Sequence, residues 1–199
     1  MQLLFATNNQ GKLKEVKMML ENTGIEVLSL IEAGDLFNKN LTSIEVKETG
    51  QTFAENALIK AKVFADETGL LTAADDSGLE VKALNNFPGI VSARWQTGSD
   101  ADRNQALLKK MAAVGDRTAQ FVTVICLYNS QTKTYKNFRG ETKGKIALEV
   151  KGEAGFGYDP IFVPDGYKKS FAELGIQVKN KLSHRHQALK KMKASFYED

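Results

Sequence analysis

The sequence contains very little cysteine, which excludes several classes of site. Its 199 residues include one cysteine, Cys126, so neither a disulfide framework nor a multi-cysteine metal site is available. Cys126 lies in QFVTVICLY, a β-branched and aromatic run typical of a buried strand. We therefore interpret Cys126 as a core thiol and not as a nucleophile.

Long hydrophobic runs are also absent. No apolar stretch approaches the roughly 20 residues that a helix needs to span a bilayer. The N-terminal MQLLFATNNQ lacks the basic and long apolar segments of a secretory signal. We therefore expect a cytoplasmic protein without a membrane partner.

The net charge is small, and the sequence has only two histidines. A net charge of +3 is too small to indicate a general nucleic-acid binder, so we expect no nucleic-acid partner. No GxSxG motif occurs, and both histidines, His184 and His186, fall in a basic tail, which disfavours a Ser/His/Asp hydrolase. That tail, residues 168–193, is either an anion-binding surface or a solvated helix face.

What the sequence does contain is enough apolar material for one core. With 42% hydrophobic and 26% charged residues, it fits a single domain, 1–199, whose core is either compact or shared by two lobes without a linker. Helical patterns interspersed with strands joined by crossovers and hairpins predict an α/β fold with a mixed sheet.

Local signals place the elements. QLLFA predicts a strand before a helix carrying Leu13 and Val16, and IEVLSL predicts a second strand. Thr52 and Glu55 form a capping-box pattern that opens a helix closed by Gly69. LLTAA predicts a buried strand that ends in an acidic turn, DDSG.

Three further elements follow. Ser99 and Asp102 predict the start of a helix that runs through MAAV. AQFVTVICLYN and TYKNFRGETKG predict a hairpin. The tail predicts a final amphipathic helix that docks through Leu189, Met192 and Phe196.

Four segments carry groups suited to chemistry. ATNNQGK follows a strand and opens a helix, so it is either a phosphate cradle, though not a Walker A loop, or an ordinary polar turn. DDSG offers Asp75 and Asp76 as Mg²⁺ ligands, with Glu45 or Glu48 as a further carboxylate, or is simply a tight turn.

The other two segments suit a nucleoside. GFGYDPIF offers Phe156 and Tyr158 as a stacking surface beside Asp159, or is a glycine turn with core aromatics. VKNKLSHRHQAL offers Lys179, His184 and Arg185 as donors near a helix start, or is a basic surface helix with His184 exposed.

Taken in order, six segments resemble the inosine/xanthosine triphosphate pyrophosphatase family over nearly the whole chain: ATNNQGK, ETGQTFAENALIKA, ADDSGLEV, PGIVSAR, AGFGYDPIF and KNKLSHR. The resemblance implies an elongated two-lobed α/β fold around a long mixed sheet with a central cleft, and a homodimer. It also implies Mg²⁺-dependent hydrolysis of ITP, dITP and XTP to the monophosphate and pyrophosphate.

The resemblance implies roles for particular residues. Asp76 is the metal ligand and general base, with Glu48 as the second metal ligand and Glu45 in reserve. Substrate-binding residues are Thr7, Asn8, Asn9, Gln10, Gly11, Lys12, Asn56, Lys60, Ser77, Phe156, Gly157, Tyr158, Asp159, Lys179, His184 and Arg185.

The chain departs from the family pattern in Lys47, within EVKE, in GIQV before KNKLSHR, and in His186 after SHR. These departures concern peripheral contacts. Two rival functions stay open: a nucleotide- or nucleic-acid-binding module without turnover, and a pyrophosphatase for modified pyrimidine nucleotides. The carboxylates of DDSG argue against a pure binder of polyphosphate.

Overall fold

The computed structural model describes residues 1–197, which form two compact units. Unit 1 contains Met1–Asp76, Thr123–Arg139 and the described residues from His186 onward. Unit 2 contains Ser77–Val122 and Gly140–Arg185. Neither unit is contiguous in sequence, because the strands β3, β5 and β6 each contribute residues to both.

One sheet has the strand order β2-β1-β3-β5-β6-β7, and β4 pairs with β3 off this path. β1 pairs in parallel with β2 and β3, whereas the β3–β4 and β6–β7 pairs are antiparallel. The α/β fold with a mixed sheet is therefore confirmed. The strands are β1 Gln2–Phe5, β2 Glu26–Leu28, β3 Thr72–Val81, β4 Phe87–Pro88, β5 Thr118–Asn129, β6 Thr134–Ile146 and β7 Phe162–Pro164.

Six α-helices lie within residues 1–197: α1 Gln10–Leu20, α2 Leu30–Phe37, α3 Phe53–Thr68, α4 Asp100–Lys110, α5 Phe171–Leu182 and α6 His184–Ala194. Short 3₁₀ turns span Leu41–Ser43, Lys82–Leu84, Gly89–Val91 and Asp159–Ile161. Within this described part, no helix has the length and apolar character needed to cross a membrane.

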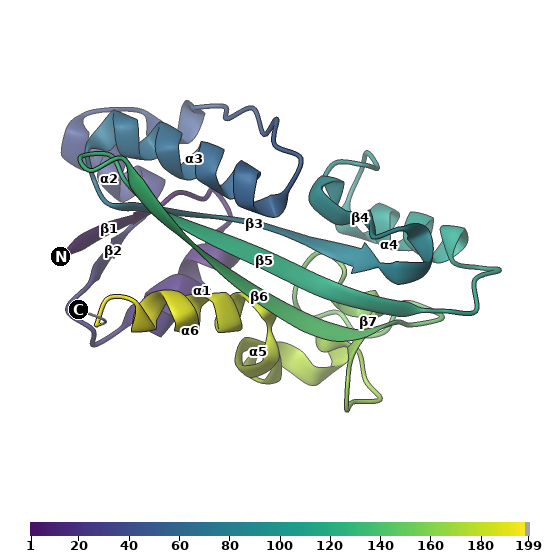
Figure 1. Ribbon diagram of the computed structural model, residues 1–199. Helices are drawn as coiled ribbons and strands as arrows, with labels where there is room; N and C mark the ends of the chain where they lie inside the picture. The colour runs from purple at the N-terminus through teal and green to yellow at the C-terminus, as the bar shows by residue number, and fades with distance from the viewer. Residues whose placement is uncertain (198–199) are drawn as a thin grey trace. The chain divides into compact units, whose positions relative to one another are not determined.

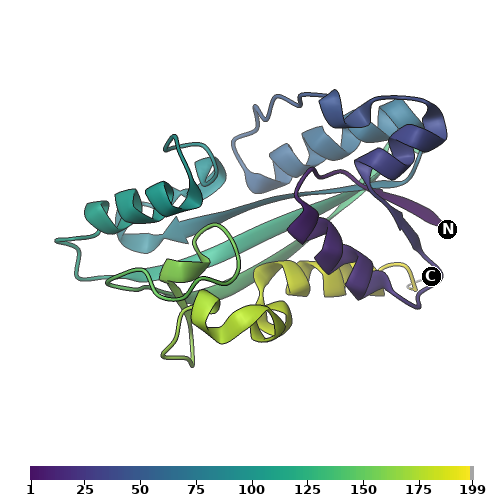
Figure 2. The ribbon, with the colours of Figure 1, turned by 180° about the vertical axis from the view of Figure 1, so that it is seen from behind.

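In unit 1, helices cover both faces of the sheet (Figure 1 and, from behind, Figure 2). Helices α2 and α3 pack on the face that carries Leu4 and Ala74. Helices α1 and α6 pack on the face that carries Leu3 and Ala73. The split follows from the strand period of two, which sends successive side chains to opposite faces.

Unit 2 has a core of its own. Leu79 and Val81 of β3 pack with Leu107 of α4 and with aromatic side chains from β5, β7 and α5. The rings of Phe121 and Phe162 lie 4.6 Å apart between centroids. This aromatic cluster supports the segments that carry the second group of candidate residues.

Several local predictions are confirmed. The first strand and helix, the β5–β6 hairpin and the docked final helix all form, and Cys126 is buried in β5. Thr52 caps α3, and Gly69 ends it with φ of 71°. The carboxylate of Glu55, however, accepts from the N–H of Gln51 and so does not close a reciprocal box with Thr52.

Other predictions were wrong. DDSG is not a turn, because β3 runs without a break from Thr72 to Val81. The second strand ends at Leu28 and gives way to the unpredicted helix α2. Helix α4 ends at Lys110, before MAAV, and α5 was not predicted.

Candidate functional site

Asp75 and Asp76 are adjacent in β3, but their carboxylates have different partners. Asp75 Oδ2 lies 2.8 Å from Lys12 Nζ of α1. Asp76 Oδ2 accepts a hydrogen bond of 3.1 Å from Asn56 Nδ2 of α3. Because successive strand residues face opposite sides of a sheet, the two acids form two separate polar contacts. The negative charge of Asp75 nevertheless adds to the rise in the pKa of Asp76.

Helix α3 brings Asn56 and Lys60 to Asp76 because residues four apart lie on one helical face. Asn56 is fully buried and accepts from the N–H of Gly50 at 2.9 Å. A Cβ on Gly50 would lie 2.7 Å from Asn56 Oδ1, so the close approach requires glycine at this position.

Lys60 lies between two carboxylates. Its Nζ is 2.6 Å from Glu48 Oε1 and 3.9 Å from Asp76 Oδ1. Burial raises the pKa of Asp76; Lys60 opposes the rise, and the negative charge of Glu48 adds to it. Asp76 is therefore a partly desolvated acid whose protonation depends on its charged neighbours, a property common among catalytic groups.

The predicted phosphate cradle forms the turn between β1 and α1. Asn9 is the N-cap of α1, and its Oδ1 accepts from the N–H of Lys12 at 3.1 Å. Asn8, Asn9, Gln10 and Gly11 are all exposed, so the start of α1 lies at the surface. A helix N-terminus of this kind favours anions.

A pocket of about 230 Å³ lies beside this turn in unit 1. Its lining includes Thr7, Asn8, Lys12 and Lys60, together with Asp75. The pocket therefore brings a hydroxyl, an amide and two ammonium groups to the end of β1. These groups match the requirements of a phosphate chain.

The carboxylates of unit 1 fit a magnesium ion only in part. Glu48 is half-buried and acts electrostatically on Asp76, whereas Glu45 is exposed. Within residues 1–197 no three His, Cys, Asp or Glu side chains gather into a metal-binding group. Mg²⁺ often takes only one or two protein carboxylates, with water and substrate phosphates as its other ligands. Asp76 and Glu48 suit that mode.

In unit 2, the segment Gly155–Asp159 is fixed by a buried ion pair. Lys179 Nζ lies 2.5 Å from Asp159 Oδ2, and both side chains are almost fully buried. The same oxygen accepts from the N–H of Phe156 at 2.9 Å. Burial raises the pKa of Asp159, and the Lys179 ammonium opposes the rise.

Of the two predicted stacking rings, only one is accessible. Phe156 is 36% exposed, with Lys179 Nζ 4.0 Å from its ring centroid. Tyr158 is 5% exposed and uses its hydroxyl in hydrogen bonds to Trp95 and Ser92. The Tyr158 ring belongs to the core of unit 2, so the aromatic face at the surface of this segment is that of Phe156. The binding role predicted for Tyr158 stays a prediction.

The basic residues at the start of the last helix are not a solvated face. His184 is buried and stacks on Phe121 with centroids 4.8 Å apart. Arg185 is 2% exposed, and its Nη2 lies 3.4 Å from the hydroxyl oxygen of Ser77. Burying such groups costs free energy, which favours the anion-binding interpretation over the surface-helix alternative.

Sequence reasoning missed part of both groups. It did not pair Lys12 with Asp75, and it gave no role to Trp95, Asp100 or Asn104, which contact Tyr158 or Gly157. The Ser99 capping box did indicate a helix at the right place. No local pattern indicated that its first turn lies against Gly157.

Comparisons with known proteins agree over the whole chain. A model of the Ham1 family matches residues 3–195. A protein of Symbiobacterium thermophilum named dITP/XTP pyrophosphatase is 45% identical over 190 residues, which cover 94% of this chain and 90% of that protein. One of the same name from Aquifex aeolicus is 40% identical over 203 residues, covering 96% and 95%.

Solved structures give the same picture. A HAM1 protein from Coxiella burnetii aligns with a TM-score of 0.90 at 37% identity and covers 100% of both chains. The Staphylococcus aureus Ham1 protein aligns with a TM-score of 0.87 at 38% identity and covers 99% of this chain and 98% of its own.

Proposed function

The chain belongs to the Ham1 family, and we propose that it hydrolyses non-canonical purine nucleoside triphosphates, such as dITP, ITP and XTP, to the monophosphate and pyrophosphate. The names of its relatives support this reaction and substrate class. Its role is to remove damaged purine nucleotides from the cytoplasmic nucleotide pool.

The residues of unit 1 handle the phosphates in this proposal. The turn Thr7–Lys12 binds the triphosphate through N–H groups at the start of α1. Lys12 and Lys60 line the same pocket and stabilise the negative charge of the departing pyrophosphate. Their present contacts with Asp75 and Glu48 keep both ammonium groups in place before substrate arrives.

Asp76 is the proposed general base. It is held beside Lys60 and Asn56 in a partly buried position, and this single observation carries the proposal of turnover. A pure binder of polyphosphate gains nothing from acids in its groove unless they hold a metal, whereas hydrolysis uses both. Asp76 and Glu48 would hold Mg²⁺, which when bound lowers the pKa of water and neutralises phosphate charge. Asp76 then accepts the proton of the attacking water.

The residues of unit 2 hold the nucleoside in this proposal. The Phe156 ring stacks on the purine, and the buried Lys179 and Arg185 supply donors beside it. Such donors favour a 6-oxo purine, because the amino group of adenine would face them without an acceptor. Ser77, whose hydroxyl lies 3.4 Å from Arg185 Nη2, and the buried His184 also bind the substrate.

A panel of substrates tests the proposal. Pyrophosphate and monophosphate are measured from ITP, XTP, ATP, GTP and dTTP, each with Mg²⁺ and with chelator. Strong, metal-dependent release from ITP and XTP is expected. Preferential release from dTTP would favour the pyrimidine enzyme, and tight nucleotide binding without release would favour the binding module.

We also propose a homodimer, as the family resemblance implies. Light scattering measures its mass directly. A mass near twice 21.9 kDa at micromolar concentration is expected, and a monomer at all concentrations would contradict the proposal.

A further inference from the structure

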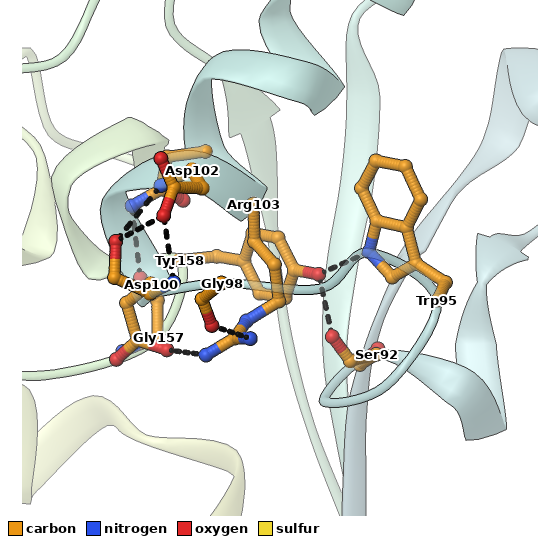
Figure 3. A network of polar contacts seen from close by, with 10 residues as sticks. Ser92, Trp95, Gly98, Asp100, Asp102, Arg103, Gly157 and Tyr158 are labelled. Atoms are coloured by element: carbon orange, nitrogen blue, oxygen red, sulfur yellow. Dashed lines mark hydrogen bonds and ion pairs between the residues drawn. The ribbon is translucent and has the colours of Figure 1, made fainter.

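Helix α4 and the turn before it hold the backbone beside Phe156 through a network of polar contacts (Figure 3). Asp100 Oδ2 accepts from the N–H of Gly157 at 2.7 Å. Asn104 Nδ2 donates to the carbonyl of Gly157 at 3.0 Å. Two side chains one helical turn apart therefore bind both polar groups of one glycine.

Asp100 is itself fixed. The guanidinium of Arg103 donates to Asp100 Oδ1 and, through Nη1, to the carbonyl of Gly98 at 2.9 Å (Figure 3). Although burial opposes it, the pKa of Asp100 lies below its usual value, because hydrogen bonds from Arg103 and Gly157 stabilise the carboxylate. The acceptor for the Gly157 N–H is thus charged and oriented.

The residues on either side of Gly157 are fixed as well. The N–H of Phe156 donates to Asp159, as described above. The Tyr158 hydroxyl donates to the carbonyl of Ser92 at 2.6 Å and accepts from Trp95 Nε1 at 2.7 Å (Figure 3). The backbone is thus held at Phe156 and Gly157 and the side chain at Tyr158, while Phe156 itself stays partly exposed to solvent.

The contacts to Gly157 are not needed to form helix α4. Ser99 and Asp102 already make the reciprocal capping box at its start. Asn104 is 2% exposed, and its Oδ1 has no hydrogen-bond partner among residues 1–197. Burying an amide with one unpaired acceptor costs free energy. The hydrogen bond from Asn104 Nδ2 to Gly157 opposes this cost.

We propose that Asp100 and Asn104 are positioning residues that set the orientation of Phe156 and so determine affinity for the purine base. The inference rests on the proposed function, in which Phe156 stacks on the base. It adds the first turn of α4 to the residues that determine affinity, although this turn contacts neither phosphate nor base. Its effect is confined to the nucleoside end of the substrate.

The test compares Asp100→Ala and Asn104→Ala with the matched control Asp102→Ala. Asp102 lies in the same helical turn and caps α4 but has no hydrogen bond to Gly157. For each variant we would measure KM and kcat for ITP, calorimetric binding of IMP, and inhibition by inorganic triphosphate at constant free Mg²⁺. Asp100→Asn, which keeps an oxygen acceptor, is the conservative variant.

In Asp100→Ala and Asn104→Ala, KM for ITP and the dissociation constant of IMP are expected to rise about tenfold, the scale of a lost charged or buried hydrogen bond. kcat should stay within about threefold, as for a loss of uniform binding. Inhibition by inorganic triphosphate should not change, and Asp100→Asn should recover most of the affinity.

Equal effects in Asp102→Ala, or parallel loss of triphosphate inhibition, would show a general structural role and overturn the inference. Failure of the wild-type protein to release pyrophosphate from ITP would overturn the proposed function instead. The binding of IMP still tests the positioning role in that case, so the two failures are distinguishable.

Discussion

Asn56 donates its side-chain amide to Asp76 Oδ2 across 3.1 Å while its own Oδ1 accepts from the N–H of Gly50. The Gly50 bond determines which end of the amide faces Asp76, because only the oxygen can accept from an N–H. Lys60 approaches the other carboxylate oxygen at 3.9 Å. Asp76 is therefore oriented from both sides.

Replacing Asp76 with Asn should separate activity from stability. We expect kcat for ITP to fall on the order of 10²-fold or more, as for loss of a positioned general base. The melting temperature should not fall, because burial already disfavours the charged form of Asp76. Pyrophosphate release and thermal unfolding measure the two effects. Full turnover by Asp76→Asn would remove Asp76 from the role of base.

As the pH is lowered, the rate should begin to fall at a higher pH than it would if the pKa of Asp76 had its ordinary value. Burial raises the pKa of Asp76, and the base must be ionised, so the rate is lost as pH falls through that raised pKa. Lys60 lowers this pKa, so Lys60→Met should move the acid limb of kcat/KM to higher pH. Lys62→Met, an exposed change on the same helix, should leave the limb in place.

A limb that does not move in Lys60→Met, or that moves equally in Lys62→Met, would contradict the electrostatic link between Lys60 and Asp76.

Glu48 and Glu45 should differ in their effect on the metal requirement. Glu48 acts electrostatically on Asp76, whereas Glu45 is exposed. We expect Glu48→Gln to raise the Mg²⁺ concentration for half-maximal rate about tenfold or more, the scale of a lost charged contact. Glu45→Gln should match the wild type. The opposite ranking in Mg²⁺ titrations would make Glu45 the ligand.

Removing Lys179 should destabilise the protein strongly. Lys179→Met leaves the Asp159 carboxylate buried without its cation, a change that costs about 3–5 kcal/mol. Lys179→Met with Asp159→Asn removes both charges and should recover much of this loss. Urea unfolding measures both, with the exposed Lys181→Met as control. A loss below about 1 kcal/mol, as in surface pairs, would show that the pair is solvated.

Much of the fold could be predicted from local patterns. Thr52 and Gly69 mark the ends of α3, and the spacing of Leu189 and Met192 identifies the buried face of α6. The two missed helices had the same kind of signal, since Ser29 with Glu32 and Ser170 with Glu173 form capping boxes. Gly34 lowers the helical propensity of α2, and Gly175 kinks α5 with a non-helical φ of 77°.

The error at Asp75 and Asp76 has a different origin. Carboxylates are unfavourable inside a buried strand unless they are paired, so the local pattern favours a turn. Their partners, Lys12 and Asn56, come from helices that are distant in sequence and pack on opposite faces of the sheet. No window of sequence around DDSG contains that information.

The candidate site was predicted mainly through the family resemblance. Alone, the charge pattern of Lys179, His184 and Arg185 favoured a solvated face, and burial emerges only from packing. The roles given to these residues and to Asp76 stay predictions.

Trp95 is the only tryptophan of the chain, and its indole N–H is bonded to the hydroxyl of Tyr158, two residues after Phe156. Phe87 lies edge-on to the indole with centroids 5.0 Å apart. Indole emission responds to hydrogen bonding and to nearby dipoles. The protein therefore carries a built-in optical probe next to the proposed base-binding segment, and rapid-mixing fluorescence could follow nucleotide arrival and product departure without an attached dye.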